Sequence, residues 1–361
     1  MTHPWTLEIA QASGDPWRKV AGLPLALRLA LAAQAAGATH IAVPKSTELA
    51  HHKFSDPRLK IPVVGVPPPE QPTVVASASL VIHREHLRAS ARAATSEAPL
   101  IIIAGDSTDG IPFGHPAVNV GSAKDVAEAE SVLFRALRKP QDGWTSTYLN
   151  RYISLFLSRF LVKTPLLPNQ VSFGILFIGL AGGYFAYQGD YVSLVIGAVL
   201  FQTQSVLDGC DGEMSRMTYR GSLAGEWLDT VGDDITNYIF FAGAASGLYS
   251  TTGNVIYAWA GAVTVFCGGM ASGIEYRYLI KIGSGDLLKY PLSQSTNEGS
   301  GPLAAIQPLF KRDTFVFLTL IATVLGQVGP MLLVFAVSAA GVLLTVIATE
   351  VRMARDARTT T

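Results

Sequence analysis

Four aspartates recur at helical spacing within a strongly apolar part of the chain. Asp208 and Asp211 are three residues apart, and Asp229 and Asp233 are four apart. Residues three or four apart share one face of an α-helix, so each pair presents two carboxylates on one side. Carboxylates among apolar residues are costly unless they are paired or bind cations. The spacing therefore predicts that the two pairs converge on one cation site. For any single aspartate, a solvated helix end is an equally good explanation.

The donor set indicates which cations such a site would bind. Four carboxylates with no His and no suitable Cys pair form a hard, oxygen-rich site that prefers Mg²⁺ or Mn²⁺ to zinc. Two such ions could clamp a diphosphate and stabilise the attacking and leaving oxygens of phosphoryl transfer. Arg216, two turns after Asp208, offers a planar donor fork to a phosphate.

The helices that carry these aspartates belong to a set of long apolar segments. The chain has 361 residues, of which 49% are hydrophobic and 15% are charged. A bilayer core of roughly 30 Å is crossed by about 20 apolar residues in a helix. Six segments are long enough: approximately 169–188, 191–214, 222–249, 254–280, 312–327 and 329–351. Residues 169–355 are therefore predicted to form an all-α domain of six transmembrane helices.

The distribution of basic residues predicts how these helices are oriented. The links after the first, third and fifth segments contain no Lys or Arg, whereas the opposite ends carry many. By the positive-inside rule, both termini lie on the cytoplasmic side of the inner membrane, as do both aspartate pairs. The N-terminal stretch lacks the basic start and apolar core of a signal peptide, which agrees with a cytoplasmic first domain.

Residues 1–140 show the alternation of an α/β domain. Residues 22–44 fit an amphipathic helix, a glycine turn and a strand, and 59–66, 78–85 and 99–105 contain further short strands. A Rossmann-like fold is predicted for this part.

Residues 141–168 are predicted to be a linker and an amphipathic helix that lies in the membrane interface. Apolar residues recur at helical spacing among three basic ones, a pattern typical of a helix whose cations face anionic headgroups. The alternative is a connector packed on the soluble domain. Pro165 and Pro168 oppose a continuous helix beyond this point.

The residues around the four aspartates match a family pattern. The run D-x2-D-G-x2-S-R-x8-G-x3-D-x3-D, from Asp208 to Asp233, closely resembles the signature of the CDP-alcohol phosphotransferases. Ser215 stands where the family usually has Ala, a change between small residues. The Pro–Asn pair that ends in Asn169 also resembles the family's entry into the first span. The resemblance covers about residues 145–355, including the six-span architecture.

The resemblance implies a mechanism. A hydroxyl of an acceptor alcohol attacks the β-phosphorus of a CDP-alcohol, and CMP leaves. Two Mg²⁺ or Mn²⁺ ions would be held by Asp208, Asp211, Asp229 and Asp233, and Asp233 would also act as the general base. The implied CDP site consists of Asn169, Asp208, Gly212, Ser215, Arg216 and Gly225. The family also implies a membrane-embedded homodimer with a role in phospholipid biosynthesis, and no nucleic-acid partner.

The N-terminal domain resembles a sugar-phosphate nucleotidyltransferase, which is fused to some members of this family and makes their CDP-alcohol, CDP-inositol in the known example. Such domains need a Gly-rich, Arg-containing loop after the first strand to hold a triphosphate. Here residues 10–22 carry one Gly before Asp15, and residues 79–87, where the acidic metal motif would fall, contain no Asp. The domain is therefore predicted to be an inactive relative that scaffolds, dimerises or regulates.

Several basic residues outside the signature are candidates for binding the phosphate of an acceptor: Arg151, Arg277, Lys311, Arg312 and Arg352. An inositol phosphate or glycerol phosphate acceptor would suit this basic rim, with CDP-diacylglycerol or a CDP-inositol type of donor. The alternative is that these residues only satisfy the positive-inside rule and contact headgroups.

Two other classes of protein could use a cation-binding aspartate cluster. An ion-coupled transporter would place it at broken helices between internal repeats, and neither feature is visible in the sequence. A non-catalytic membrane scaffold could bind cations without turnover. The complete signature favours the enzyme over both.

Overall fold

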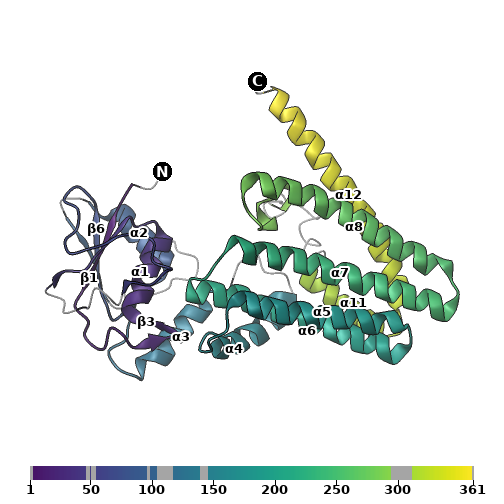
Figure 1. The fold of residues 1–361 in the computed structure, drawn as a ribbon, viewed down its shortest axis with the longest axis horizontal. Helices are drawn as coiled ribbons and strands as arrows, with labels where there is room; N and C mark the ends of the chain where they lie inside the picture. The colour runs from purple at the N-terminus through teal and green to yellow at the C-terminus, as the bar shows by residue number, and fades with distance from the viewer. Residues whose placement is uncertain are drawn as a thin grey trace. The chain divides into compact units, whose positions relative to one another are not determined.

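The chain folds as two compact units, drawn together in Figure 1. The computed structural model describes residues 3–45, 49, 54–95, 98–103, 117–138, 145–293 and 311–359. Unit 1 comprises Met1–Lys139, Arg159–Pro165 and Ser215–Arg220, and unit 2 comprises Pro140–Ser158, Leu166–Met214 and Gly221–Thr361. Residues 141–144 of the expected linker lie outside the described residues.

Unit 1 is built on a parallel sheet. The order of its five described strands is β5-β4-β1-β6-β8, and every neighbouring pair is parallel. The strands are β1 (Thr6–Ala10), β4 (His40–Ala42), β5 (Val63–Val64), β6 (Thr73–Ser77) and β8 (Leu100–Ile102). The chain starts in the centre at β1, adds strands on one side and then crosses to the other. This is the doubly wound order of Rossmann-like folds, so the predicted α/β fold with a parallel sheet is confirmed.

Helices complete unit 1 around an apolar core. They are α1 (Leu25–Ala36), α2 (Arg84–Ala93) and α3 (Asp125–Arg135). Helix α1 is rich in Leu and Ala and almost wholly buried, and it ends at Gly37, whose φ of 97° only glycine adopts readily. Two small antiparallel pairs flank the sheet: β2 (Lys19–Val20) with β3 (Leu23–Pro24), and β7 (Leu80–Val81) with β9 (Val118–Asn119).

Unit 2 is helical. A π-helical turn, Ser146–Asn150, leads into α4 (Arg151–Leu161). The long helices are α5 (Pro168–Gln188), α6 (Tyr191–Thr218), α7 (Leu223–Thr252), α8 (Val255–Ile282), α11 (Arg312–Val324) and α12 (Val328–Thr359). The last turn of α6 and the end of α4 belong to unit 1.

A helix occupies each of the six predicted segments, but they are not equivalent as membrane spans. Within the described part of the chain, four helices are long and apolar enough to cross a bilayer: α5, α6, α8 and α12. Helix α11 has only 13 residues, and α7 carries four acidic residues in its first half. The structure thus shows four candidate spans and does not confirm the count of six.

Glycines let α7 approach its neighbour α5 closely. A Cβ atom added at Gly243 would lie 2.5 Å from the carbonyl oxygen of Gly183, so backbones touch where most helix pairs interpose side chains. On α6, Phe201 stacks on Phe240 of α7 with ring centroids 4.4 Å apart. These contacts hold α5, α6 and α7 side by side, as Figure 1 shows, and fix which face of α7 meets α6.

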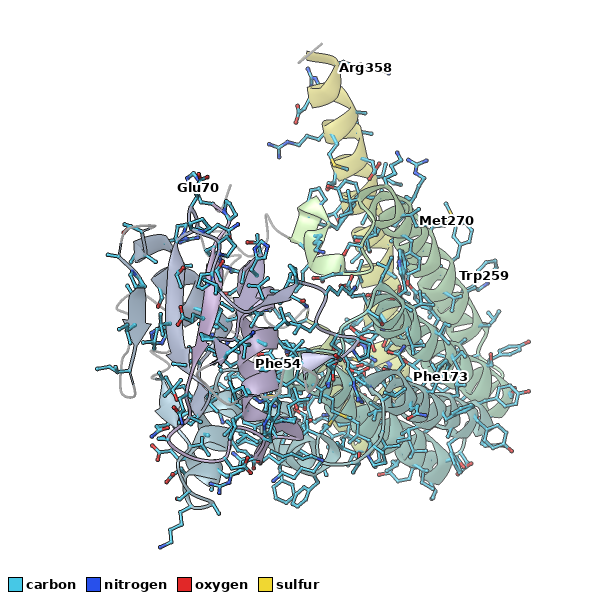
Figure 2. The ribbon with its side chains drawn as sticks, turned by 60° about the vertical axis from the view of Figure 1, so that its left-hand side comes forward. Phe54, Glu70, Phe173, Trp259, Met270 and Arg358 are labelled. Atoms are coloured by element: carbon cyan, nitrogen blue, oxygen red, sulfur yellow. The ribbon has the colours of Figure 1, made fainter. Side chains whose placement is uncertain are left out.

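Many large apolar side chains of unit 2 face outward. Phe173, Trp259 and Met270, labelled in Figure 2, are each about half exposed or more. In a soluble protein these side chains would contact water, which disfavours a large exposed apolar surface. The outward apolar surface therefore agrees with a multi-pass membrane protein.

Candidate active site

The four predicted aspartates border one small cavity. Asp208 and Asp211 reach it from α6, and Asp229 and Asp233 reach it from α7. Its volume is about 10 Å³, close to the minimum for one water-sized occupant. The remaining lining comes from Ser172, Ile175, Leu176, Gln204, Leu228 and Gly232. The helical spacing and the antiparallel packing of α6 and α7 therefore bring the two pairs together.

The other acidic residues of the same stretch face elsewhere. Glu213 is fully buried on the α4 side of α6. Glu226 accepts hydrogen bonds from the Ser284 hydroxyl and the Gly285 amide, both at 3.1 Å. Asp234 accepts a hydrogen bond of 2.6 Å from the Tyr276 hydroxyl. Seven acidic residues thus separate into four at the cavity and three with structural partners.

Asp211 is the most enclosed of the four aspartates. Its side chain accepts hydrogen bonds from the Ser172 hydroxyl on α5 and from the backbone amide of Gly212. The residue is 7% exposed. Bonds to both carboxylate oxygens hold the orientation of Asp211.

Arg312, the first residue of α11, joins the carboxylates. The Arg312 guanidinium lies 2.9 Å from Asp233 and 3.7 Å from Asp208. It also donates to the side-chain oxygen of Gln204 at 2.6 Å and to that of Asn237 at 3.3 Å. The Gln204 amide in turn donates to Asp233 at 3.3 Å. A positive charge and a network of amides therefore surround the predicted general base.

Carboxylates on α6 and α7 supply the oxygen ligands that divalent ions prefer. Among the described residues, no three His, Cys, Asp or Glu side chains are close enough together to hold one ion as placed. Asp211 and Asp233 instead engage Ser172 and Arg312. The chemistry nevertheless fits, because four carboxylates on two packed helices border one cavity and side-chain rotation alone can redirect them.

Two residues of the implied CDP site meet where α5 and α7 begin. A Cβ atom on Gly225 would lie 3.0 Å from the amide oxygen of Asn169 and 3.2 Å from the Ser222 hydroxyl. Ser222 is the N-cap of α7 and accepts a bond from the Gly225 amide. Pro168 occupies the first turn of α5, where its missing N–H costs nothing. The absence of a side chain at Gly225 lets Asn169 approach the start of α7 closely.

The rest of the implied CDP site lies along α6. Asp208 and Gly212 belong to unit 2, whereas Ser215 and Arg216 form part of the last turn of the helix, which is counted with unit 1. One continuous helix therefore carries four of the six implied CDP residues.

The five basic candidates for an acceptor phosphate have different surroundings. Only Arg312 lies at the carboxylates. Arg151 is buried, 2.7 Å from Glu213. Arg277 is largely exposed, 3.6 Å from Glu350. Lys311 is the N-cap of α11, and Arg352 is exposed on α12. The site geometry therefore favours Arg312 among the five.

Helix α4 buries three polar residues beside Leu155 and exposes several aromatic ones. Arg151, Ser154 and Ser158 all donate to the Glu213 carboxylate, at 2.7, 2.8 and 2.7 Å. Tyr152, Phe156 and others lie on the exposed face. The basic residues expected to face headgroups have other partners: Arg159 lies over the Phe134 ring and Lys163 pairs with Glu130. An outward aromatic face still suits contact with lipid.

Sequence reasoning missed the neutral residues of the cavity. Gln204 lies one turn before Asp208 on α6, and Ser172 lies one turn after Pro168 on α5. The sequence carries only a weak signal for these two residues. They are an amide and a hydroxyl at helical spacing from Asp208 and Pro168, within otherwise apolar segments.

A second cavity lies at the carboxyl ends of the strands in unit 1. Its volume is about 410 Å³, within the range of small-molecule sites. It lies where the strand order reverses between β1 and β6, the usual ligand position in such sheets. Its polar lining is neutral: Gln11, Ser13, Ser77, Ser79 and Asn119. No acidic or basic side chain is among the described residues that line it.

Comparison with known proteins identifies the class. The family model of CDP-alcohol phosphatidyltransferases matches residues 165–347, just over half of the 361 residues. The chain belongs to this family, and the predicted resemblance to CDP-alcohol phosphotransferases is confirmed.

Curated relatives of this chain carry a narrower name than the family. The "Bifunctional IPC transferase and DIPP synthase" of Aquifex aeolicus is 28% identical over 226 residues, which are 62% of this chain and 48% of the relative. The protein of the same name in Archaeoglobus fulgidus is 33% identical over 150 residues, 41% of this chain and 29% of the relative. That of Thermococcus kodakarensis is 32% identical over 125 residues, 34% of this chain and 28% of the relative. The chain thus spans less than half the length of each of these relatives.

Proposed function

We propose that this protein transfers a substituted phosphate group from a CDP-alcohol to the hydroxyl of an acceptor alcohol and releases CMP. The observation that carries the proposal is the convergence of Asp208, Asp211, Asp229 and Asp233 on one cavity, in a chain that belongs to the CDP-alcohol phosphatidyltransferase family.

The residues divide the work of this reaction. Asp233 takes the proton from the acceptor hydroxyl, and the amide of Gln204 orients it. Two Mg²⁺ or Mn²⁺ ions held by the four aspartates would offset the negative charge of the diphosphate. The cytidine diphosphate is bound by Asn169, Asp208, Gly212, Ser215, Arg216 and Gly225. The small residues among these leave room for the ligand to approach the backbone.

Arg312 is the proposed ligand of an acceptor phosphate. Its guanidinium lies beside Asp233, so a phosphate bound to it would bring the attached alcohol next to the general base. An inositol phosphate acceptor and a CDP-inositol donor are favoured, because the N-terminal domain resembles the fused domain that makes CDP-inositol in some members of the family. Glycerol phosphate and CDP-diacylglycerol are the alternatives of the same reaction type.

The α/β domain is proposed to be inactive as a nucleotidyltransferase. The cavity at the carboxyl ends of its strands lacks charged residues among its described lining, and a triphosphate requires cationic side chains or a metal to balance its charge. The domain therefore keeps the fold without the expected chemistry.

The proposed setting is the inner membrane. The four candidate spans, together with α7 and α11, would form six spans with both termini in the cytoplasm. A homodimer is proposed on the strength of the family alone.

The test is CMP release by the purified full-length protein with Mg²⁺ or Mn²⁺. CDP-inositol and CDP-diacylglycerol serve as donors against inositol phosphate, glycerol phosphate and free inositol. We expect release with one donor–acceptor pair and a loss of about 10²–10⁴-fold in Asp233→Asn, the usual contribution of a general base. Asp234→Asn is the matched control, because the carboxylate of Asp234 accepts a hydrogen bond from Tyr276 and does not border the cavity. Metal binding without release from any pair would instead support a cation-binding transporter or scaffold.

A further inference from the structure

The end of helix α6 is capped from within unit 1. Helix α6 ends at Thr218, and the last four carbonyls of any α-helix lack partners inside it. The side chain of Arg28 donates to the Met217 carbonyl at 3.1 Å. The side chain of Arg58 donates to the Thr218 carbonyl at 2.8 Å. Two cations at a helix C-terminus also complement the negative end of its dipole.

The turn that follows α6 is of the kind that ends helices tightly. The Arg220 amide donates to the Ser215 carbonyl at 3.0 Å, the six-to-one bond of a Schellman motif. Tyr219, which lies between Thr218 at the end of α6 and Arg220, has a φ of 53°. This left-handed position usually belongs to glycine, and a side chain there strains the backbone.

The tyrosine side chain accounts for that exception. Tyr219 packs against Leu23, Leu27 and Leu31 of the α/β domain, so its ring is an apolar anchor that a glycine would lack. Burial raises the pKa of Tyr219, and the nearby Arg28 partly offsets the effect. The α/β domain thus holds the loop through one aromatic ring and two guanidinium groups.

Both arginines are fixed before they reach α6. Arg28 is 3% exposed and also donates to the carbonyls of Val20 and Ala21 at 2.8 and 3.0 Å. Arg58 forms a fork with Asp56, with bonds of 2.7 Å to each carboxylate oxygen. Pre-ordered donors lose little entropy on binding a carbonyl. The contacts are therefore built into the domain rather than being chance surface pairs.

We infer that Arg28 and Arg58 are positioning residues of the transferase, which hold the helix end that carries Ser215 and Arg216. The inference rests on the proposed function, because Ser215 and Arg216 belong to the implied CDP site. It gives the α/β domain a task that needs no nucleotidyl transfer. The domain provides the C-terminal cap of α6, within one turn of the proposed nucleotide contacts.

The test uses the full-length protein in nanodiscs with Arg58→Ala, Arg58→Lys and Arg28→Ala. Hydrogen exchange of the peptide that covers residues 213–220 reports the cap, and calorimetric titration with CDP in Mg²⁺ reports the site. We expect Arg58→Ala to speed exchange and weaken CDP binding by about three- to tenfold, the usual net contribution of one hydrogen bond. Arg58→Lys keeps the charge without the fork and should fall in between.

Arg88→Ala is the matched control, because Arg88 pairs with Glu85 on α2 instead of reaching α6. It should change neither readout. Unchanged exchange in both Arg58→Ala and Arg28→Ala would overturn the cap. Faster exchange with unchanged CDP affinity would overturn the positioning role. If the wild-type protein binds no CDP, the proposed function fails, whereas the exchange result still decides whether the cap exists.

Discussion

At the scale of single residues, the structure separates acidic side chains that the sequence presents as one group. Asp233 and Asp234 are neighbours in the chain, yet one borders the carboxylate cavity and the other bonds Tyr276. Successive residues of a helix point about 100° apart, so adjacent side chains meet different helices. Asp229 and Asp233, four residues apart, share the side of α7 that borders the cavity.

Arg312→Ala should impair the acceptor more than the donor. Removal of the guanidinium takes away the proposed phosphate contact beside Asp233. We expect the KM for a phosphorylated acceptor to rise by about ten- to a hundredfold, the scale of a charge-assisted contact. The KM for the CDP-alcohol should stay within about twofold. Steady-state CMP release at varied concentrations of each substrate measures both.

The matched control is Lys281→Ala, which removes an exposed cation from the end of α8. It should leave both KM values unchanged. A rise confined to the KM of the donor in Arg312→Ala would instead place this guanidinium on the diphosphate.

The neutral part of the cavity shows where prediction from sequence stopped. The four aspartates could be selected because carboxylates in apolar helices are rare and their spacing is regular. Gln204 and Ser172 could not, because amides and hydroxyls occur throughout membrane helices and their role depends on which faces meet. The pairing of Arg151 with Glu213 was hidden for the same reason, since 62 residues separate the two in the chain.

At the scale of elements, α4 and α6 are joined by a buried ion pair. Arg151→Ala would leave the Glu213 carboxylate, which is 0% exposed, without its cation. Loss of one partner of a buried pair typically costs about 3–5 kcal/mol, so the unfolding temperature in detergent should fall clearly. Arg277→Ala is the comparison: its side chain is 69% exposed and 3.6 Å from Glu350, and exposed pairs contribute about 0–1 kcal/mol. Equal shifts in the two variants would contradict this account.

The contact of α5 with α7 should be equally sensitive. Gly243→Ala would place a methyl group 2.5 Å from the Gly183 carbonyl, and overpacking of this kind costs about 1–3 kcal/mol. Gly269→Ala on α8 meets nothing within 4 Å, so the gain in helix propensity should leave it neutral or slightly stabilised. Thermal unfolding of both variants distinguishes the two effects. An unfolding temperature that Gly243→Ala leaves unchanged would mean that α5 and α7 can move apart without loss of stability.

The elements themselves were mostly predictable. All six long helices of unit 2 coincide with predicted apolar segments, because hydropathy and helix length are coupled in a bilayer. In unit 1, β4, β5, β7 and β8 lie within predicted strand segments, β1 was implied only as the strand before the loop at residues 10–22, and the central strand β6 was missed. Thr6–Ala10 and Thr73–Ser77 mix polar and apolar residues. Their central place comes from pairing with distant strands rather than from a strong local pattern.

At the scale of the whole molecule, the proposed topology can be tested by labelling. Thr252→Cys places a thiol at the last residue of α7, beside the link to α8, and Lys281→Cys places one at the far end of α8; both positions are exposed. An impermeant maleimide should label the first in intact cells and the second only after permeabilisation. The wild-type protein, with its buried Cys210 and partly buried Cys267, gives the background. Labelling of Lys281→Cys in intact cells would reverse the orientation.

The left-handed tyrosine that follows α6 also has a genetic consequence. If the α/β domain serves by binding Tyr219 and the end of α6 rather than by transferring nucleotides, substitutions should be harmful mainly at the residues that make these contacts. In a saturation library selected for activity, the neutral cavity around Ser13 and Asn119 should accept most changes. Depleted variants should cluster instead at the leucines that pack on the ring and at the two arginines. The positions in the α/β domain that are sensitive to substitution would then mark its contacts with the end of α6 instead of a catalytic pocket.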